Sequence, residues 1–452
     1  MTTFLKAVRV GGLACLWLAG LSAGACAQTA SPVPQPVQTL TLDQAIALAS
    51  ANEPAFASAM AERGVAKLDQ TNAKAAMLPT AIYHNQALYT QPNGVAASRI
   101  GQTTGAPAPA FIANNAVREY ASQGVFNETV GFGQVGAIKL ANANAARAEA
   151  ELEITRRGLV NTVVSLYYGL GAGAEKVTIT DRALAEANHF LEITQKREAA
   201  RESAHADVLK AQLQQQQRQR EVADARLEAD KARLELAVLL YPDPNTPFAL
   251  EPVTAPPVLP DRAAIEALAR QNNPELKSAM ASLQARQAET YSAKAALAPD
   301  LGLNFTYGID ATNFGVNGPD GIHNLGYSMS AQLDIPVWDW LTTERKIKQS
   351  KLQETASQVA LSAAQRRLIA SLSEFYAEAD AANQQMASFD ASVVTARESL
   401  RLTTLRYVDG ESTVLEVVDA QTTLATAENA QIEGRVRYRL ALANLQTLTG
   451  KL

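Results

Sequence analysis

The chain contains one helical segment twice, at residues 48–79 and again at 268–299. The two copies align without a gap and share an Asn-x-Pro triplet near the start and a single proline at the end. Chance similarity between alanine-rich helices would not also align both prolines, so we interpret the match as an internal duplication. Proline disfavours helix at the residue before it, and each copy should therefore end near Pro79 or Pro299, where a helix passes into a strand.

Both halves continue with the same series of predicted elements. Segments rich in Tyr, Phe, Gly, Asn, Gln and Thr, with imperfect alternation, predict strands at about 80–89 and 117–132. Clear alternation of apolar and polar residues predicts strands at about 301–309 and 325–337. Helices are predicted at about 43–78, 137–201, 205–240, 342–407 and 413–449. The proline-rich residues 241–260 are typical of a linker. The prediction is a first repeat at 28–240 and a second at 261–452, each with a helix, two strands, a long helix and a further helix.

The first residues have the features of a secretory signal peptide. Lys6 and Arg9 precede an apolar run that is too short to span a membrane, and the triplet Ala25-Cys26-Ala27 fits cleavage at its end. Residues 1–27 would then be removed together with both cysteines, and lipidation of Cys26 is the alternative. Once Lys6 and Arg9 are removed, the net charge is more negative than −5, which argues against a nucleic-acid partner.

Little in the sequence indicates catalysis. There is no glycine-rich phosphate loop, the four histidines are scattered without ligand spacing, and the mature chain would have no thiol. We therefore expect no enzyme activity, no cofactor and no metal site.

The strand pairs favour a membrane barrel. In the second pair, large apolar and aromatic residues alternate with small polar ones, as in a strand with lipid on one side and water on the other. A half-buried soluble hairpin alternates in the same way, but the secretory signal favours the membrane. Four strands cannot close a barrel, and open edges are not tolerated in a bilayer. A membrane-spanning sheet would therefore require an oligomer.

Several motifs in this frame resemble those of the TolC-like outer-membrane efflux family. They are the paired Asn-x-Pro helices, Leu-Asp-Ile-Pro-Val-Trp-Asp at 333–339 with Arg345, and Arg406-Tyr407-x-x-Gly410 leading into Val-Val-Asp-Ala-Gln at 417–421. The resemblance covers nearly all of the mature chain. It implies a mixed α and β membrane protein, a homotrimer whose chains share a twelve-stranded β-barrel in outer-membrane lipid. This barrel would continue into a long periplasmic α-barrel of twelve helices.

The function implied by the resemblance is a channel for efflux or type I secretion. It would receive its cargo from a periplasmic membrane-fusion adaptor and an inner-membrane transporter. The sequence does not identify the cargo. A periplasmic coiled-coil adaptor or structural protein that does not conduct is the alternative, but such a protein would normally have one central hairpin between compact β domains.

The turns between the long helices are the candidate site. The resemblance implies that Glu416 and Asp419, at i and i+3 on one helix face, line the pore constriction. Rings of three carboxylates would favour cations and raise some of the carboxyl pKa values. An ordinary solvated acidic face is the alternative interpretation.

Other residues at the two tips would hold the closed state. Arg406 and Tyr407 are candidates to bond across to a neighbouring hairpin, with Asp207 as the latch partner, although Lys210 stands where the second half has Asp419. The tips themselves pair Arg201 and Ser203 of the first half with Gly410 and Ser412 of the second. Because Arg201 replaces a glycine, docking at the two tips is expected to differ.

Overall fold

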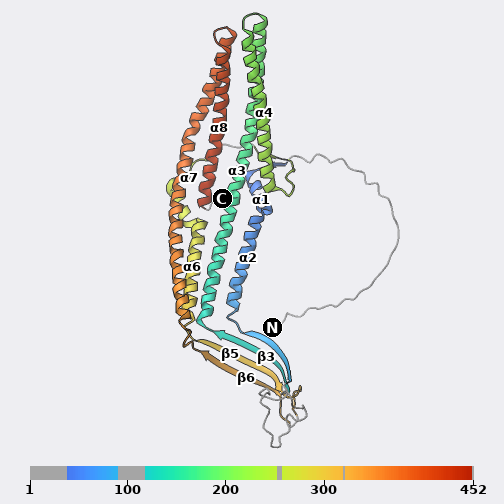
Figure 1. The fold of residues 1–452 in the computed structure, drawn as a ribbon, viewed down its shortest axis with the longest axis vertical. Coiled ribbons are helices and arrows are strands. Elements are labelled where there is room, and N and C mark those ends of the chain that lie inside the picture. Colours follow the sequence, from blue (N-terminus) through green and yellow to red (C-terminus); the bar gives the residue numbers. More distant parts are fainter. Residues whose placement is uncertain (1–37, 90–117, 252–256, 319–320, 450–452) are drawn as a thin grey trace, which may run out of the picture. The chain divides into compact units, whose positions relative to one another are not determined.

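The computed structural model describes residues 38–89, 118–251, 257–318 and 321–449. The signal peptide expected at 1–27 lies outside the described residues. From Thr39 onward the chain forms one compact unit, and Figure 1 shows its elements. In chain order they are β1 (Gln38–Leu40), α1 (Leu42–Asn52), α2 (Pro54–Ala75), β2 (Thr80–Tyr89), β3 (Arg118–Val130), α3 (Phe132–Ala199), α4 (His205–Leu240), β4 (Phe248–Leu250), α5 (Arg262–Asn272), α6 (Pro274–Ala295), β5 (Asp300–Ala311), β6 (Leu325–Asp334), α7 (Thr342–Val408) and α8 (Val414–Thr449).

The first helix of each half is interrupted at its proline. A single helix was expected over 43–78, but the structure has α1 and α2 with the extended residue Glu53 between them. Pro54 has no N–H to donate and its ring disfavours helical backbone at the preceding residue, which explains the break. The second half has the same break between α5 and α6, where the Asn273 side chain accepts from the backbone N–H of Leu276 at 2.8 Å.

Several element ends differ from the sequence-based expectation, among them the end of β6 and the start of α3. β6 ends at Asp334 rather than near residue 337, since Pro336 cannot donate to the strand ladder. α3 begins at Phe132 rather than near residue 137, and the Gln134 side chain accepts from Gly131 N at 3.1 Å. The bounds of β2 and α4 agree with those expected, as does the position of Pro79 and Pro299 directly before a strand.

The four long strands form an antiparallel sheet in the order β2-β3-β5-β6. The register places Phe126, Phe305 and Met329 side by side on one face. On β5 this apolar face is the more exposed one, with Phe305 and Tyr307 exposed while Asn304 and Thr306 on the opposite face are partly buried. On β6 both faces are exposed, and Tyr327 and Met329 are each 77% exposed. A soluble hairpin would bury its apolar face, whereas an exposed one suits contact with lipid.

The helices continue the order of the strands. α2 packs on α3, α3 on α6, and α6 on α7, so that α2 and α7 lie at the margins of the row as β2 and β6 do in the sheet. α4 folds back on α3, and α8 on α7, which gives two helical hairpins (Figure 1). With 68 residues, α3 is about 100 Å long.

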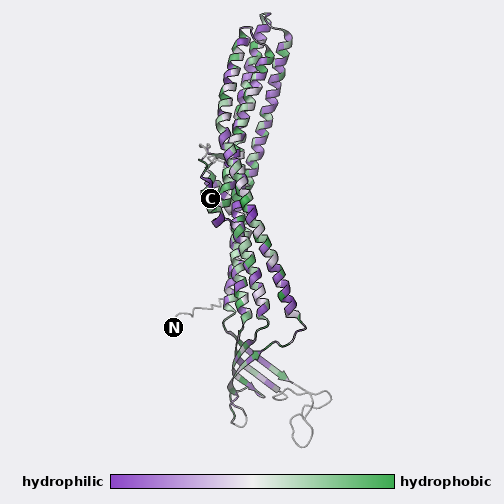
Figure 2. Ribbon diagram, turned by 90° about the vertical axis from the view of Figure 1, so that its left-hand side faces the viewer, coloured by the Kyte–Doolittle hydropathy of each residue, from purple (hydrophilic) through white to green (hydrophobic). Residues whose placement is uncertain are grey.

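Hydrophilic and hydrophobic residues are mixed along the helices, as Figure 2 shows. Within the part of the chain that the structure describes, no helix has a stretch long and apolar enough to cross a membrane.

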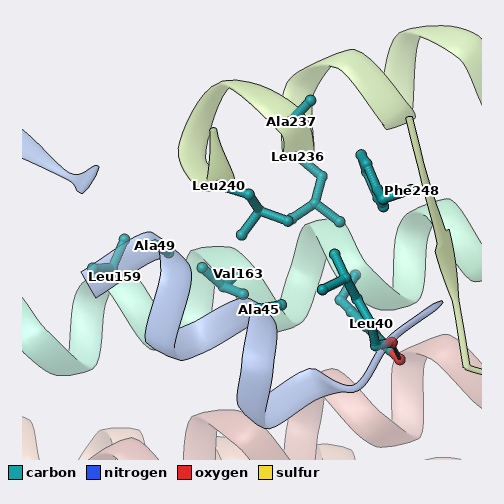
Figure 3. Close-up of a cluster of buried hydrophobic side chains, with 10 residues drawn as sticks. Leu40, Ala45, Ala49, Leu159, Val163, Leu236, Ala237, Leu240 and Phe248 are labelled. Carbon is teal, nitrogen blue, oxygen red and sulfur yellow. Dashed lines mark hydrogen bonds between the residues drawn. The ribbon is translucent and has the colours of Figure 1, made fainter. Parts of the chain in front are cut away.

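Two cores, here called the root cores, hold the bases of the hairpins. In the first, α1 packs between α3 and the end of α4 (Figure 3). The hydroxyl of Tyr167 donates to Leu40 O at 3.0 Å, and Asn52 Nδ2 donates to Leu240 O at 2.6 Å. In the second, α5 packs against α7 and α8 through Ile265, Leu372 and Leu445 among others. Each hairpin is thus anchored by the short first helix of its own half.

Candidate functional site: the hairpin tips

Both tips end their long helix with the same backbone turn. The bonds that close the turns are Arg201 N to Glu198 O and Glu202 N to Arg197 O after α3, and Gly410 N to Tyr407 O and Glu411 N to Arg406 O after α7. This pattern is a Schellman motif, which needs one residue in the left-handed conformation. Gly410 takes it at φ 83° without strain, while Arg201 takes it at φ 61° at a cost of about 1–2 kcal/mol. The missing glycine therefore leaves the backbone of the first tip unchanged and alters only its side chain.

Tyr407 joins the second hairpin to the first. Its side chain is only 3% exposed and meets Phe190 of α3 in an edge-to-face contact at 5.1 Å between ring centroids. The guanidinium of Arg197 lies 4.9 Å from the Tyr407 ring centroid, and its Nη1 donates to Tyr407 O. The hydroxyl of Tyr407 lies 3.5 Å from Thr194 Oγ1. The contacts of Tyr407 across to α3 are therefore made with Arg197, Thr194 and Phe190.

Asp207 and Arg406 do not meet in this protomer. The carboxylate of Asp207 lies 3.9 Å from Lys210 on the next turn of its own helix, and Arg406 Nη2 donates to Glu411 O within its own tip. Ser203, behind the first tip, is placed to donate to Thr194 O at 3.5 Å. Of Arg406, Asp207 and Tyr407, only Tyr407 has a hydrogen bond or ring contact to the other hairpin of the same chain within the described residues.

Glu416 caps the start of α8. Its backbone N–H points to Thr413 Oγ1 and its Oε1 accepts from Thr413 N, both at 3.4 Å, so that the two residues form a capping box. Ser412 Oγ donates to the other carboxylate oxygen at 2.8 Å. The hydrogen bond from Ser412, then those from Thr413, lower the pKa of Glu416. Within one chain the pKa of Glu416 is therefore lowered, whereas a ring of carboxylates from three chains was expected to raise it.

Asp419 lies one turn beyond Glu416 and is exposed, as Glu416 is. The residues between and after them, Val417 and Ala420, are buried against the rest of the hairpins. The two carboxylates therefore share the solvent-facing side of α8, and both interpretations drawn from the sequence require that exposure.

An arginine–glutamate cluster, made of Arg182, Arg397 and Glu428, connects the hairpins farther from the tips. Glu428 on α8 is 4% exposed, and its Oε1 accepts from Arg182 Nη2 of α3 at 2.7 Å and from Arg397 Nη2 of α7 at 2.9 Å. Beside it, the buried Arg218 of α4 reaches Thr422 Oγ1 of α8 at 3.4 Å. Sequence reasoning missed this cluster because its members come from three helices and no local spacing relates them.

Glu186 borders this cluster and gives it a pH dependence. Burial has the largest effect on the pKa of Glu186 and raises it. The positive charge of Arg182 has the second largest effect and lowers it. The charged groups around it are Arg182 on α3, Arg218 on α4, Arg397 on α7 and Glu428 on α8. A folded-state pKa above the unfolded value means that the folded chain binds more protons. Stability should therefore fall as pH rises through this window and stay lower above it.

Glu186→Gln should remove that slope and stabilise the hairpins at neutral pH, with no gain below the unfolded pKa of Glu. Thermal unfolding of the purified protein between pH 4 and 8 would measure it. Glu192→Gln is the matched control on the same helix, because a hydrogen bond from Lys196 lowers the pKa of Glu192. The stabilising contribution of Glu192 is present at neutral pH and is lost as pH falls. Glu192→Gln should therefore lower stability at neutral pH, whereas Glu186→Gln should raise it. Equal slopes in the two variants would contradict the assignment.

The described residues contain no group of three or more His, Cys, Asp or Glu side chains placed to hold a metal ion. The geometry at the tips instead combines exposed carboxylates, a buried aromatic contact between hairpins and a capping box. Such a site can favour or exclude ions by charge and can change shape by separating the hairpins.

A family model described as outer membrane efflux protein matches residues 130–240 and 267–451, which is more than half of the chain. The chain belongs to this family. Membership makes it a TolC-type efflux channel protein of the cell outer membrane, with a long part in the periplasm.

Individual relatives agree with the family match. CyaE of Bordetella pertussis is 25% identical over 323 residues, which cover 70% of this chain and 67% of CyaE. The pyoverdine export outer membrane protein OpmQ of Pseudomonas aeruginosa is 25% identical over 307 residues, which cover 67% of this chain but only 61% of OpmQ. The solved structure of the outer membrane protein VceC from Vibrio cholerae shares the fold, with a TM-score of 0.76 at 16% identity over 91% of this chain and 96% of VceC.

Proposed function

We propose that three copies of this chain close one barrel and one tunnel. β2 and β6 are the margins of the sheet, α2 and α7 are the margins of the helix row, and both marginal helices expose large apolar side chains. Those on α2 include Met60 and Leu68, and those on α7 include Leu352 and Val359. A second copy could add its β2 beside β6 and its α2 beside α7, and three copies would give twelve strands. Since a bilayer does not tolerate open strand edges, the exposed apolar sheet carries this proposal.

The two halves are proposed to be repeats of one ancestral unit, at 28–240 and 261–452, with 241–260 as the linker and 1–27 removed on export. The matching breaks at Pro54 and Pro274 and the two root cores support this division.

The trimer would be a passive conduit without catalytic function. Cargo would enter at the hairpin tips from a periplasmic adaptor and an inner-membrane transporter, pass the helical tunnel and leave through the barrel. Glu416 and Asp419 would narrow and charge the entrance. The exposure of both carboxylates on one side of α8 supports this role. Glu416 would both narrow the entrance and cap the start of α8.

The gate assignment is tested by Glu416→Gln with Asp419→Asn in planar bilayers. Glutamine keeps the capping box, so that the change removes charge without fraying α8. We expect larger single-channel conductance and weaker block by divalent cations, because the carboxylate rings that hold cations would be gone. The matched control is Asp409→Asn with Glu411→Gln, which removes the same charge from exposed positions in the turn itself. If both variants conduct like the unmodified protein, these carboxylates do not form the constriction.

A non-conducting periplasmic adaptor remains the second candidate. The exposed apolar face of the sheet argues against it, because a periplasmic protein would place that face against water. Heat-modifiable migration of a trimer in the outer-membrane fraction supports the channel. A soluble periplasmic monomer would contradict it.

A further inference from the structure

Six cations lie where the helices meet the strands, and we call them the basic collar. The collar comprises Lys74 in the last turn of α2, Lys294 in the last turn of α6, and Arg345, Lys346, Lys348 and Lys351 in the first turns of α7. All six side chains are exposed. The first ten residues of α7 contain four of them and only one acid, Glu344.

None of the collar cations has an ion-pair partner among the residues that the structure describes. Some exposed cations elsewhere on the helices have partners, as Arg63 does with Glu149 at 2.5 Å and Lys176 with Glu228 at 2.8 Å. Lys74 and Lys294 complement the negative ends of their helices, but the dipole of α7 opposes positive charge at its beginning. The four cations of α7 thus repel one another and the helix end. Glu344 and Asp339, whose carboxylate accepts from Thr343 N at 2.7 Å, supply only two negative charges at this start, and an anion from outside the chain would offset the rest.

The collar adjoins the strands that are proposed to contact lipid. Seven residues separate the end of β6 from the start of α7, and they include Trp338 and Trp340, which are 67% and 78% exposed and stack edge to face at 5.9 Å. Exposed tryptophan is typical of the level of the lipid headgroups. From Thr342 to Lys348 the helix rises only about 9 Å, and a headgroup layer is roughly 5–8 Å thick. Most of the collar therefore falls at or just beyond the lipid phosphates.

We propose that the basic collar binds the phosphate groups of anionic glycerophospholipids in the periplasmic leaflet of the outer membrane. The inference rests on the proposed function, in which the strands cross that membrane. Lysine and arginine beside such a surface attract its negative charge. The collar is spread over three helices rather than gathered in a pocket, which suits many lipid headgroups and not one small anion. Lipid binding would hold the barrel at a defined depth.

Titration of the full-length, detergent-purified protein with phosphatidylglycerol or phosphatidylcholine, read by native mass spectrometry, tests this. Each lysine near an anionic surface contributes about a fivefold effect, so Lys346→Gln with Lys348→Gln should weaken phosphatidylglycerol binding roughly 30-fold. Phosphatidylcholine binding should not change. The matched control is Arg366→Gln with Arg367→Gln, which removes the same charge from exposed positions about 30 Å farther along α7. The control should bind phosphatidylglycerol as the unmodified protein does.

The outcomes separate this inference from the proposed function. Equal affinity for the two lipids, or equal weakening in both variants, would contradict lipid binding by the basic collar. Neither result would contradict the proposed barrel. Binding of soluble glycerol phosphate as tight as that of phosphatidylglycerol would overturn the lipid as the occupant. Retention of neither lipid by the unmodified protein would count against membrane-spanning strands, and thus against the proposed function itself.

Discussion

Replacing Arg182 and Arg397 together by methionine should weaken the junction between the hairpins by about 3–5 kcal/mol, because Glu428 would remain as a buried carboxylate without its partners. Glu428→Met should cost less, about 1–3 kcal/mol. The arginine side chains are 45% and 58% exposed and can turn into water once the carboxylate is gone. With all three residues changed to methionine, most of the stability should return, since an apolar contact can replace a buried charge cluster.

Hydrogen exchange of the α8 peptide that contains Glu428 would measure these differences as changes in local opening free energy. Arg226→Met is a suitable control, because it removes an exposed ion pair with Asp181 and should cost less than about 1 kcal/mol. If Glu428→Met proved as costly as the double arginine variant, desolvation of the carboxylate would not be the dominant effect.

Tyr407→Ala should release the tip of the second hairpin from the first, at a cost of about 3–5 kcal/mol for a buried aromatic side chain. Tyr407→Phe should stay within about 1 kcal/mol, because the 3.5 Å contact of the hydroxyl with Thr194 is at the limit of a hydrogen bond. Faster hydrogen exchange in the first turns of α8 would report the release.

Leu405→Ala provides the matched comparison two residues away, where the side chain is 49% exposed and should matter little. In the proposed channel, Tyr407→Ala should also increase conductance, because a released tip no longer holds the entrance closed. Unaltered exchange in Tyr407→Ala would show that the tip is held by other contacts.

Periodicity predicted the elements well where a single physical signal governed them. β5 begins directly after Pro299 and alternates apolar and polar residues, and α4 runs from His205 to Leu240 as its pattern indicates. The break at Glu53 was missed, although Pro54 was visible, because helical periodicity continues on both sides of it. The local effect of the missing N–H outweighed the pattern.

The candidate site was less accessible from sequence. The Thr413-x-x-Glu416 spacing is a local signature of a capping box and could have been found. The contact of Tyr407 with Arg197 could not, because it depends on how two hairpins pack across more than two hundred residues of sequence. The same holds for Glu428, whose partners lie on two other helices.

The pairing of β3 with β5 has a consequence for the order of folding. The first root core uses only residues between Leu40 and Phe248, and the second draws its buried members from Ile265 to Leu445. A chain that is exported from its N-terminus can therefore close the first root core while its second half is still in transit. The four-stranded sheet cannot form at that stage, because one edge of β3 has no partner until β5 has been exported. The first root core can thus form before the sheet is complete, whereas the second, whose members extend to Leu445, can form only after β6 has been exported.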